Sequence, residues 1–317
     1  MTSQTLNLSN WMAALDDRLT MDQLSIPGTH DSGTQKIGSG PYHTQNFGIT
    51  QQLADGIRFL DIRLTQTSSS KPGDPLLVYH GDKSCHISFG DVLNDCAAFF
   101  SANPSEAVFM LVNYASGDDP EYVVFSGFQT YLDNPAYANL LCIATAPLAL
   151  PLSALRGKVV LLRRFNAPAS AQLGMNLQQQ ADPFNGVGWT NNDAATFNTV
   201  TPDGQSSLRI EDKYKTYDIG DKTTAVSNSL DKASQNAGDG KLYLTFNSIQ
   251  YHLGTTPYQW AWTTNQGQAM NPQLKDYFQA NGGKARLGVV ALDFYNNETG
   301  SLDNTIVEAV VSSNFGT

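Results

Sequence analysis

Short apolar stretches of about strand length recur along the chain and alternate with longer amphipathic stretches. Eight of the short stretches contain many β-branched and aromatic residues and are typical of strands: 23–28, 57–64, 76–81, 107–114, 158–165, 208–215, 241–249 and 287–295. Helical patterns lie between several of them, at residues 47–56, 87–104, 121–134, 223–238, 271–283 and 301–315. Several of the strands are apolar through much of their length, as in a parallel sheet covered on both faces.

This alternation predicts an α/β protein, and eight strands suggest an irregular TIM-type (β/α) barrel. No repeat, low-complexity tract or Pro/Ser-rich linker divides the chain, so a single domain over residues 1–317 is expected. Residues 166–207 are rich in Asn, Gln, Asp, Gly and Thr and show no clear helix. The barrel should therefore be irregular after its fifth strand.

Composition and charge exclude several classes of protein. With 317 residues, of which 41% are hydrophobic, the chain can bury a sizeable core and is not disordered. A formal net charge of -10 opposes nucleic acid as the main partner, so an anionic ligand must be held by a few local cations. No stretch approaches the roughly 18 apolar residues of a transmembrane helix. The start, MTSQTLNLSNW, lacks a signal-peptide pattern, although a mature secreted protein with an added Met would look the same.

The three cysteines, Cys85, Cys96 and Cys142, are too few for a disulfide framework and lack the spacing of a zinc site. Reduced and mostly buried thiols are the favoured interpretation. A bridge between Cys85 and Cys96 stays open as the alternative.

Titratable residues follow most of the predicted strands, at the end where barrel active sites form. In chain order they are His30 and Asp31, Asp61 and Arg63, His80, Arg163 and Arg164, Asp212 and Tyr214, and Asp293. Either His30 or His80 alone is more often a structural histidine. Together, with Arg63 between them in the sequence, they suggest a base, an acid and a phosphate clamp, because an imidazole with a pKa of about 6.5 populates both protonation states near neutral pH.

Asp61 and Arg63 are spaced i, i+2 and therefore project from the same face of a strand. Such a pair could be a structural ion pair in the mouth of the barrel. The guanidinium also offers a planar fork of donors that matches two phosphate oxygens. Phosphate binding is the interpretation that we favour for Arg63.

Six motifs carry a resemblance to a known family: SIPGTHDSG, FLDIR, VYHG, GKVVLLRRF, EDKYK and VALDFYN. In this order and at these intervals they resemble the secreted bacterial phosphatidylinositol-specific phospholipases C, from about residue 10 to the C-terminus. SIPGTHDSG is quite specific, whereas a lone YHG or EDKY would be weak. The resemblance implies an irregular TIM barrel that cleaves phosphatidylinositol to diacylglycerol and inositol 1,2-cyclic phosphate, and then slowly hydrolyses the cyclic ester.

The same resemblance assigns five residues to the chemistry. His30 matches the general base that takes the proton of the inositol 2-hydroxyl, and Asp293 matches the carboxylate that orients this base. His80 matches the general acid that protonates the diacylglycerol oxygen, assisted by Asp31. Arg63 matches the arginine that holds the phosphate and activates the nucleophile.

Further residues match positions that support the arginine or bind the sugar. Asp61 resembles the carboxylate beside the arginine. Arg164 and Asp212 match residues that bind inositol hydroxyls, and Tyr214 matches the aromatic platform under the ring; a charged fork, a carboxylate and a flat ring suit a sugar with hydroxyls at its rim and C–H groups on its faces. The family often has a lysine where this chain has Asn113 at the end of the fourth strand. Asn113 can donate a hydrogen bond but supplies no positive charge.

No metal and no cofactor are expected. In metal-dependent relatives, acidic residues at the ends of the early strands bind calcium at the place that Arg63 takes here, and a guanidinium and a calcium ion would repel each other. Asp31, Asp61 and nearby Asn residues leave a calcium-dependent version of the same reaction open.

An aromatic cluster at residues 256–267 lies between the last two predicted strands, and a second set lies at residues 42–47. Aromatic side chains are more often core than anchor, but Tyr258, Trp260 and Trp262 stand among polar residues without a helical apolar stripe. Members of the family use this rim to touch the bilayer. We therefore expect these three residues at a membrane-facing rim of a secreted monomer whose partner is membrane phosphatidylinositol.

Two rival functions come from other classes. A glycerophosphodiester phosphodiesterase is also a barrel with two histidines, but it needs clustered carboxylate ligands for a metal, and no such set is evident beside His30 and His80. A non-catalytic phosphoinositide-binding barrel would have lost the chemistry, whereas both histidines and Arg63 are present.

Overall fold

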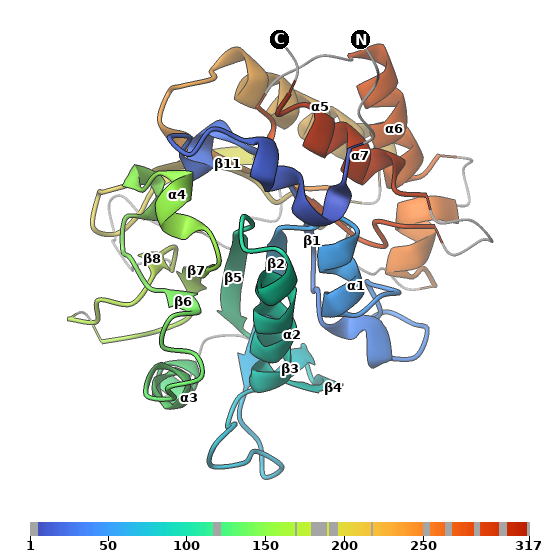
Figure 1. Ribbon diagram of the computed structural model, residues 1–317. Helices are drawn as coiled ribbons and strands as arrows, with labels where there is room; N and C mark the ends of the chain where they lie inside the picture. Colours follow the sequence, from blue (N-terminus) through green and yellow to red (C-terminus); the bar gives the residue numbers. More distant parts are fainter. Residues whose placement is uncertain are drawn as a thin grey trace.

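The computed structural model describes residues 6–116, 122–168, 170–178, 189, 196–216, 218–249, 254–263, 268–281, 286–297 and 303–315. One sheet of 12 strands organises the molecule, in the order β6-β7-β5-β2-β1-β12-β11-β10-β9, with β3 and β4 attached to β2 and β8 attached to β7 (Figure 1). The strands are β1 (Ser25–Thr29), β2 (Phe59–Thr65), β3 (Leu77–His80), β4 (Lys83–Ser88), β5 (Val108–Tyr114), β6 (Leu141–Cys142), β7 (Val159–Arg164), β8 (Met175–Asn176), β9 (Thr196–Val200), β10 (Ser207–Glu211), β11 (Lys241–Phe246) and β12 (Gly288–Leu292).

Each of the six predicted helices is present, with ends shifted by a few residues. The α-helices are α1 (Ile49–Ala54), α2 (Phe89–Ala102), α3 (Val123–Leu132), α4 (Leu152–Leu155), α5 (Ile219–Gln235), α6 (Met270–Ala280) and α7 (Thr305–Ser312). Short 3-10 helices are η1 (Leu8–Ala14), η2 (Met21–Gln23), η3 (Thr34–Lys36) and η5 (Pro147–Ala149), and η6 (Gln259–Thr263) is a π-helical turn. A capping box begins α2: Ser88 accepts from the Asp91 amide, and Asp91 accepts from the Ser88 amide.

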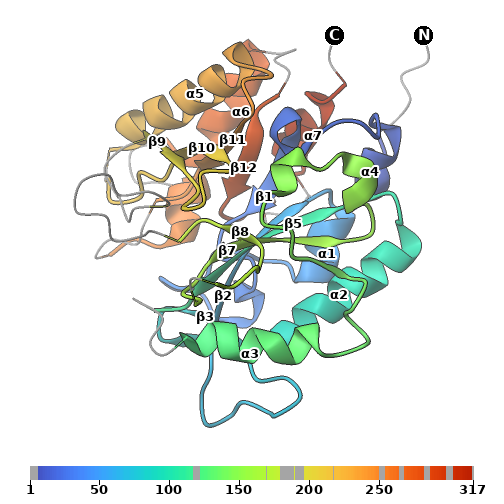
Figure 2. The same cartoon turned by 90° about the vertical axis from the view of Figure 1, so that its left-hand side faces the viewer.

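Seven of the parallel strands form the curled wall of the barrel. From β1, parallel pairing continues through β2, β5 and β7 on one side and through β12, β11 and β10 on the other. In the described part of the chain no ladder joins β6, β7 or β8 to β9 or β10, so the sheet curls without closing (Figure 2). The prediction of an irregular α/β barrel is confirmed, and its parallel strands all deliver their C-terminal ends to one rim.

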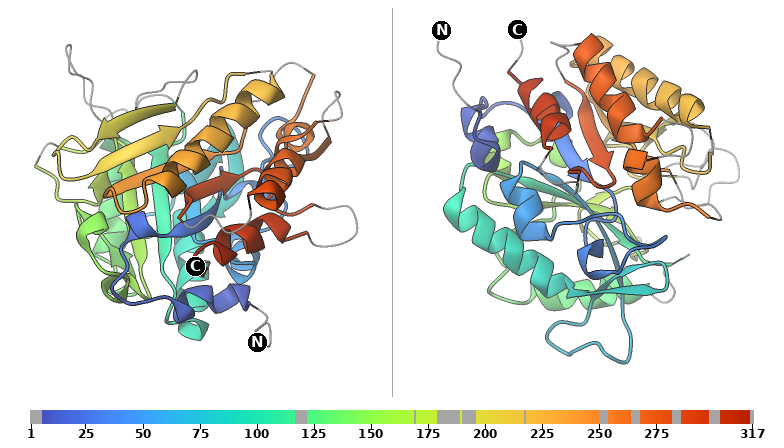
Figure 3. Two further views of the ribbon diagram at one scale, coloured as in Figure 1. Left: turned by 90° about the horizontal axis from the view of Figure 1, so that it is seen from above. Right: turned by 90° about the vertical axis from the view of Figure 1, so that its right-hand side faces the viewer.

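Helices cover the outer side of this wall. α5 packs on β10 and β11, α7 packs on β1, and α3 packs on β2 (Figure 3). The side chain of Phe59 on β2 packs directly against the β1 backbone at Gly28, where an added Cβ would lie 2.8 Å from the Phe59 ring. Glycine is therefore required at this position of the SIPGTHDSG motif.

The third predicted strand is not a barrel strand. Its residues form β3, which pairs antiparallel with both β2 and β4. A β-hairpin therefore stands where a parallel strand was expected. The period-2 pattern of a strand is the same in both cases, so the sequence did not distinguish them.

The described part of residues 166–207 contains no helix, as expected, but it does contain the short strands β8 and β9. Cys85, Cys96 and Cys142 are free thiols, so the alternative of a bridge between Cys85 and Cys96 is not realised. Burial raises the pKa of Cys85 to about 12, which keeps this thiol protonated and unreactive. Among the described helices none is long and apolar enough to cross a membrane.

Candidate active site

His30 stands at the C-terminal end of β1, directly beside the end of β12. The parallel register pairs Thr29 with Leu292, so the residues that follow, His30 and Asp293, face each other. The His30 amide donates to the Leu292 carbonyl at 3.0 Å, and the ring Nδ1 lies 2.8 Å from Asp293 Oδ1. Because a carboxylate can only accept, Nδ1 carries a proton and Nε2 is left to face the cavity side of the ring.

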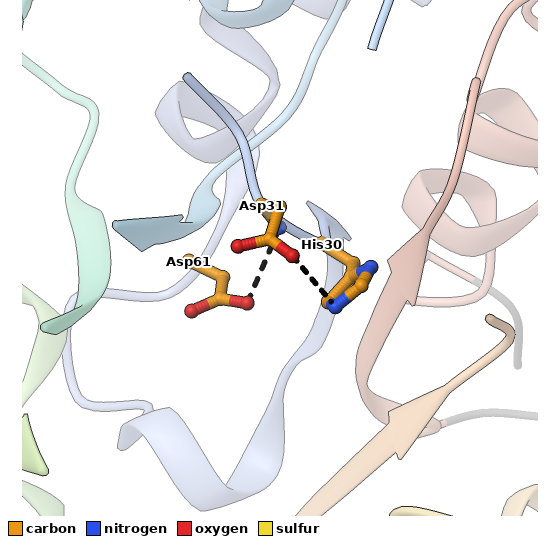
Figure 4. Close-up of side chains that lie close together, drawn as sticks. All are labelled: His30, Asp31 and Asp61. Atoms are coloured by element: carbon orange, nitrogen blue, oxygen red, sulfur yellow. Dashed lines mark hydrogen bonds and ion pairs between the residues drawn. The ribbon is translucent and has the colours of Figure 1, made fainter. Parts of the chain in front are cut away.

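Two groups approach His30 Nε2. Asp31 Oδ2 lies at 3.1 Å (Figure 4). Arg63 Nη2 lies at 3.0 Å. The Asp31 backbone adopts the left-handed region with φ 44°, which turns this carboxylate back toward the neighbouring ring. Its amide donates to Asp61 Oδ2 at 3.2 Å, and the Asp61 amide donates to Ser32 Oγ at 2.9 Å.

His80 reaches the same place from the end of the β3–β4 hairpin. Its Nε2 lies 3.2 Å from Asp31 Oδ2, and its Nδ1 donates to the Tyr42 carbonyl at 2.9 Å. The rings of His30 and His80 are 6.4 Å apart at 78°. Asp31 therefore lies between the two imidazoles, one on each side of a single carboxylate.

Arg63 projects from β2 toward both carboxylates. Its Nε lies 2.7 Å from Asp31 Oδ1, although the N–H is not aligned with a hydrogen-bond acceptor, and Nη2 lies 3.6 Å from Asp61 Oδ2. Burial opposes the charge, but Asp31 and Asp61 outweigh that effect and raise the pKa of the guanidinium. The guanidinium is thus held by the charges of Asp31 and Asp61, with Nη2 beside His30 Nε2.

A calcium ion does not fit this arrangement. His30, Asp31 and Asp61 each offer a ligand atom within 4.8 Å of the others. The Arg63 guanidinium already lies among the same atoms, and one of the three donors is an imidazole nitrogen, whereas calcium prefers oxygen.

The charges of the site shift its pKa values in opposite directions. Burial alone would lower the pKa of His30, but Asp31 and Asp293 more than reverse this and raise it to about 9. Burial acts the other way on Asp31, yet Arg63 and the two histidines lower the pKa of this carboxyl. Burial raises the pKa of Asp293. At neutral pH, in the absence of substrate, the His30 ring is therefore protonated on both nitrogens and positively charged.

The sugar-binding candidates lie at the ends of β5 and β7 and directly after β10. The register pairs Arg63 with Asn113 on β5 and Asn113 with Arg164 on β7, so these three residues form a row across adjacent strands. The Arg164 guanidinium stacks on the Trp189 ring at 4.2 Å, and Trp189 Nε1 donates to Asp212 Oδ2 at 3.0 Å. Burial lowers the pKa of Arg164 and raises that of Asp212. The Trp189 indole thus holds the Arg164 guanidinium over its ring and the Asp212 carboxylate at its Nε1.

Two further candidates, Arg163 and Tyr214, lie beside these residues. Arg163 is 5% exposed and donates to the carbonyls of Leu173 and Phe165, so of the two consecutive arginines Arg164 is the one at the rim. Tyr214 follows Asp212 in the same turn, where its amide donates to the Asp212 carbonyl at 3.1 Å. Its ring is half-buried.

Comparison with known proteins decides the family. Residues 33–165 match the phosphatidylinositol-specific phospholipase C, X domain. A 1-phosphatidylinositol phosphodiesterase of Staphylococcus aureus strain Newman is 30% identical over 315 residues, covering 96% of this chain and 94% of that protein. The chain belongs to the phosphatidylinositol-specific phospholipase C family. A relative from Listeria monocytogenes with the same description is 26% identical over 305 residues, which cover 93% of this chain and 84% of the relative.

Solved structures agree on the fold of this phospholipase C family member. A double mutant of the phosphatidylinositol-specific phospholipase C from Staphylococcus aureus superposes with a TM-score of 0.80 at 28% identity and covers 97% of each chain. The enzyme from Listeria monocytogenes gives a TM-score of 0.68 at 22% identity, covering 97% of this chain and 99% of the other, and shows the fold alone.

Sequence reasoning missed several side chains that build the site of this phospholipase C family member. Trp189 lies in the segment with no clear pattern, so nothing in the sequence pointed to its stack with Arg164. Phe246, at the end of β11, lies edge-on to His30 at 6.1 Å and to Trp189 at 5.5 Å. Its place at a strand end, beside the motif residues, was a signal that could have been used.

A buried ion pair was also missed. Lys222 on α5 and Glu211 on β10 are both fully buried, with Nζ at 2.9 and 2.8 Å from the two carboxylate oxygens. Glu211 also accepts from the Lys213 amide at 3.1 Å. The pair therefore fixes the turn that carries Asp212.

The aromatic rim is largely inside the fold, which corrects the expectation for Trp260. Trp260 is 9% exposed and belongs to the hydrophobic core. Trp262 is half-buried and its Nε1 donates to the Phe294 carbonyl at 2.8 Å, while the Tyr258 ring packs edge-on against Phe294 at 5.1 Å. These rings brace the turn after Asp293, because η6 folds back onto the end of β12.

Proposed function

We propose that this chain cleaves phosphatidylinositol to diacylglycerol and inositol 1,2-cyclic phosphate, and then slowly hydrolyses the cyclic ester. Two relatives that cover nearly the whole chain are described as 1-phosphatidylinositol phosphodiesterases. The observation that carries the proposal is the placement of His30 and His80 on two sides of Asp31, with Arg63 beside His30 and Asp31. An acid and a base close to an anion-binding fork suit an in-line displacement at phosphorus.

In the first step the inositol 2-hydroxyl oxygen attacks phosphorus. Its proton passes to His30 Nε2, whose other nitrogen is held by Asp293 at 2.8 Å. The phosphorus–oxygen bond to diacylglycerol breaks, and the leaving oxygen takes a proton from His80. Arg63 binds the phosphate oxygens, on which negative charge grows as the transition state forms.

In the second step the roles reverse. Water attacks the cyclic phosphorus and gives its proton to His80, which is neutral after the first step. His30 returns its proton to the 2-oxygen as the bond to that oxygen breaks. Both histidines finish in their starting states, so the site needs no external proton store.

The sugar is held on the other side of Arg63. Arg164 and Asp212 bind inositol hydroxyls from the face of Trp189, which keeps both groups in place. Tyr214 supplies the flat surface under the ring, and Asn113 adds a neutral hydrogen bond between the two arginines of the row. The lack of a cation at this position disfavours inositol rings that carry extra phosphates.

The proton on His30 sets the pH dependence. With a pKa of about 9, only about 1% of the free protein has a neutral His30 at pH 7. The rate at low substrate should therefore rise with pH up to that pKa.

Arg63 supplies the positive charge at the phosphate, and the proposed reaction uses no metal and no cofactor. We propose further that the chain acts as one catalytic unit, a monomer that is secreted and touches the membrane from outside. One solved structure of the Staphylococcus aureus relative comes from work on the modulation of its membrane binding. A single sheet contains all the described strands from β1 to β12, which supports one catalytic unit.

The test uses vesicles of phosphatidylinositol and of phosphatidylcholine. The wild type should release diacylglycerol from the first and not from the second, and His80→Ala should lose about 10²–10⁴-fold of the rate. His86→Ala, an exposed histidine on β4, is the matched control and should keep the activity. Equal cleavage of both lipids, or a folded His80→Ala as active as the wild type, would contradict the proposal.

A further inference from the structure

We propose that residues 42–45, which lie between η3 and α1, are a positioning segment that fixes the general acid and the general base relative to each other. This inference rests on the proposed function for the roles of the two histidines. The segment contacts the ends of β1 and β12, which carry the base and its carboxylate, and also the β3–β4 hairpin, which carries the acid.

Tyr42 holds the acid. Its carbonyl accepts from His80 Nδ1 at 2.9 Å, and its ring lies edge-on to the imidazole at 5.4 Å. A carbonyl has no proton to give, so Nδ1 of His80 must carry one. Nε2 is then the nitrogen that faces Asp31 and, in the proposed reaction, the leaving oxygen.

Thr44 holds two residues of the site whose backbones are left-handed, Asp31 and Phe294. Asp31 and Phe294 both have φ 44°, which side-chain-bearing residues rarely adopt, and each lies directly after a proposed catalytic residue. The Thr44 carbonyl accepts from the Phe294 amide at 2.7 Å, and Thr44 Oγ1 donates to the Asp31 carbonyl at 3.0 Å. One residue therefore stabilises both of the turns that aim the site's carboxylates.

Gln45 joins the two strand ends. Its side chain is fully buried, and Nε2 donates to the His30 carbonyl at 2.8 Å and to the Leu292 carbonyl at 2.7 Å. Leu292 precedes Asp293. Both hydrogens of the amide are thus used where His30 faces Asp293, so Gln45 sets the distance between the base and its carboxylate.

The segment is itself anchored from behind. Thr34 Oγ1, in η3, accepts from the amides of Thr44 and Gln45, both at 3.1 Å. The two threonine hydroxyls are 2.7 Å apart. Because the Thr44 hydroxyl hydrogen is given to Asp31, the Thr34 hydroxyl donates to Thr44. Each hydroxyl has one donor role in this network, which leaves Thr44 a single orientation.

The experiment replaces Gln45 by Met, which has a similar length and no donor. The first readout, without substrate, is the downfield NMR signal of the proton between His30 Nδ1 and Asp293. The second is kcat and KM on inositol 1,2-cyclic phosphate. The charged groups that face His30 are Asp31, Asp293, Arg63, His80 and Asp212, and the variant keeps all of them.

The matched control removes the hydrogen bonds that a side-chain amide makes at the other end of β1. Asn314 Nδ2 donates to the carbonyl of Ser25, the first residue of β1, at 2.8 Å, and its Oδ1 accepts from the Ser25 amide at 2.8 Å. Asn314→Leu should lower thermal stability but keep both the downfield signal and kcat. It therefore measures what lost stability alone does to the readouts.

For Gln45→Met we expect the downfield signal to broaden or disappear and kcat to fall about 10- to 100-fold with little change in KM, as for a reacting group displaced by a fraction of an ångström to one ångström. An unchanged signal and kcat, or equal changes in Asn314→Leu, would overturn the proposal. Should Gln45→Met not fold, Thr44→Val and Thr44→Ser provide the test: Ser keeps the hydroxyl and should retain kcat, whereas Val should not. If wild type fails on phosphatidylinositol but the signal responds as expected, the proposed function falls and the positioning role stands.

Discussion

Asp293→Asn removes the carboxylate that contacts His30 Nδ1 at 2.8 Å while keeping the shape of the side chain. In the wild type the pKa of His30 rises from 6.5 to about 9 against the opposing effect of burial, and Asp31 and Asp293 cause the rise. A shift of that size corresponds to about 3 kcal/mol of interaction that favours the charged ring. Losing one of the two carboxylates, in a ring that is 19% exposed, should lower the pKa of His30 by at least about one unit.

The same shift contributes to stability with a defined sign. Because the folded pKa of His30 lies above the unfolded value, its stabilising contribution is fully present below about pH 6.5 and is lost as the pH rises through about 9. The wild type should therefore lose up to about 3 kcal/mol from this group between pH 6 and pH 10. Asp293→Asn should lose less, so the difference in unfolding free energy between the two proteins should shrink as the pH rises.

Two assays measure this. An NMR titration of the His30 ring gives the pKa in both proteins, and urea unfolding at pH 6 and pH 10 gives the free energies. The expected kinetic loss in Asp293→Asn is about 10²–10⁴-fold in kcat, because the base loses its orienting partner. A His30 pKa that is the same in both proteins, together with a stability difference that does not depend on pH, would refute the electrostatic reasoning.

Three further outcomes follow from contacts of the site and the core. Arg63→Lys keeps the charge but loses the planar fork, so kcat should fall at least about 100-fold and added calcium should not restore it; calcium activation of this variant would instead identify an ion site. Trp260→Ala should cost about 3–5 kcal/mol of unfolding free energy and slow cleavage of soluble and vesicle substrates alike, whereas a loss confined to vesicles would return Trp260 to the membrane rim. Lys222→Met leaves the Glu211 carboxylate buried without its partner and should cost about 3–5 kcal/mol in chemical unfolding, which Glu211→Leu in the same chain should largely restore; no restoration would contradict a simple pair.

The parallel wall and the contact between base and carboxylate could be predicted from the sequence. Apolar runs give the strands, and parallel pairing places the residues that follow β1 and β12 side by side, which brings His30 to Asp293 without knowledge of any loop. The row of Arg63, Asn113 and Arg164 follows from register in the same way.

Other features depend on tertiary contacts that leave no local pattern. The β3–β4 hairpin has the same alternation as a parallel strand. Only its antiparallel pairing shows that His80 comes from a hairpin and not from a strand of the wall. Trp260 stands among polar neighbours, yet η6 packs against α6 and buries it. Trp189 lies in a stretch without periodicity, and its role depends on where Arg164 and Asp212 meet. Such contacts are set by residues distant in the chain.

Phosphorus NMR of the products formed from phosphatidylinositol, in the presence of a metal chelator, tests the central claim most directly. Two imidazoles and a guanidinium, acting without a metal, should first yield inositol 1,2-cyclic phosphate, which then declines slowly as inositol 1-phosphate appears. A chelator that abolishes turnover, or inositol 1-phosphate formed with no cyclic ester before it, would contradict the account.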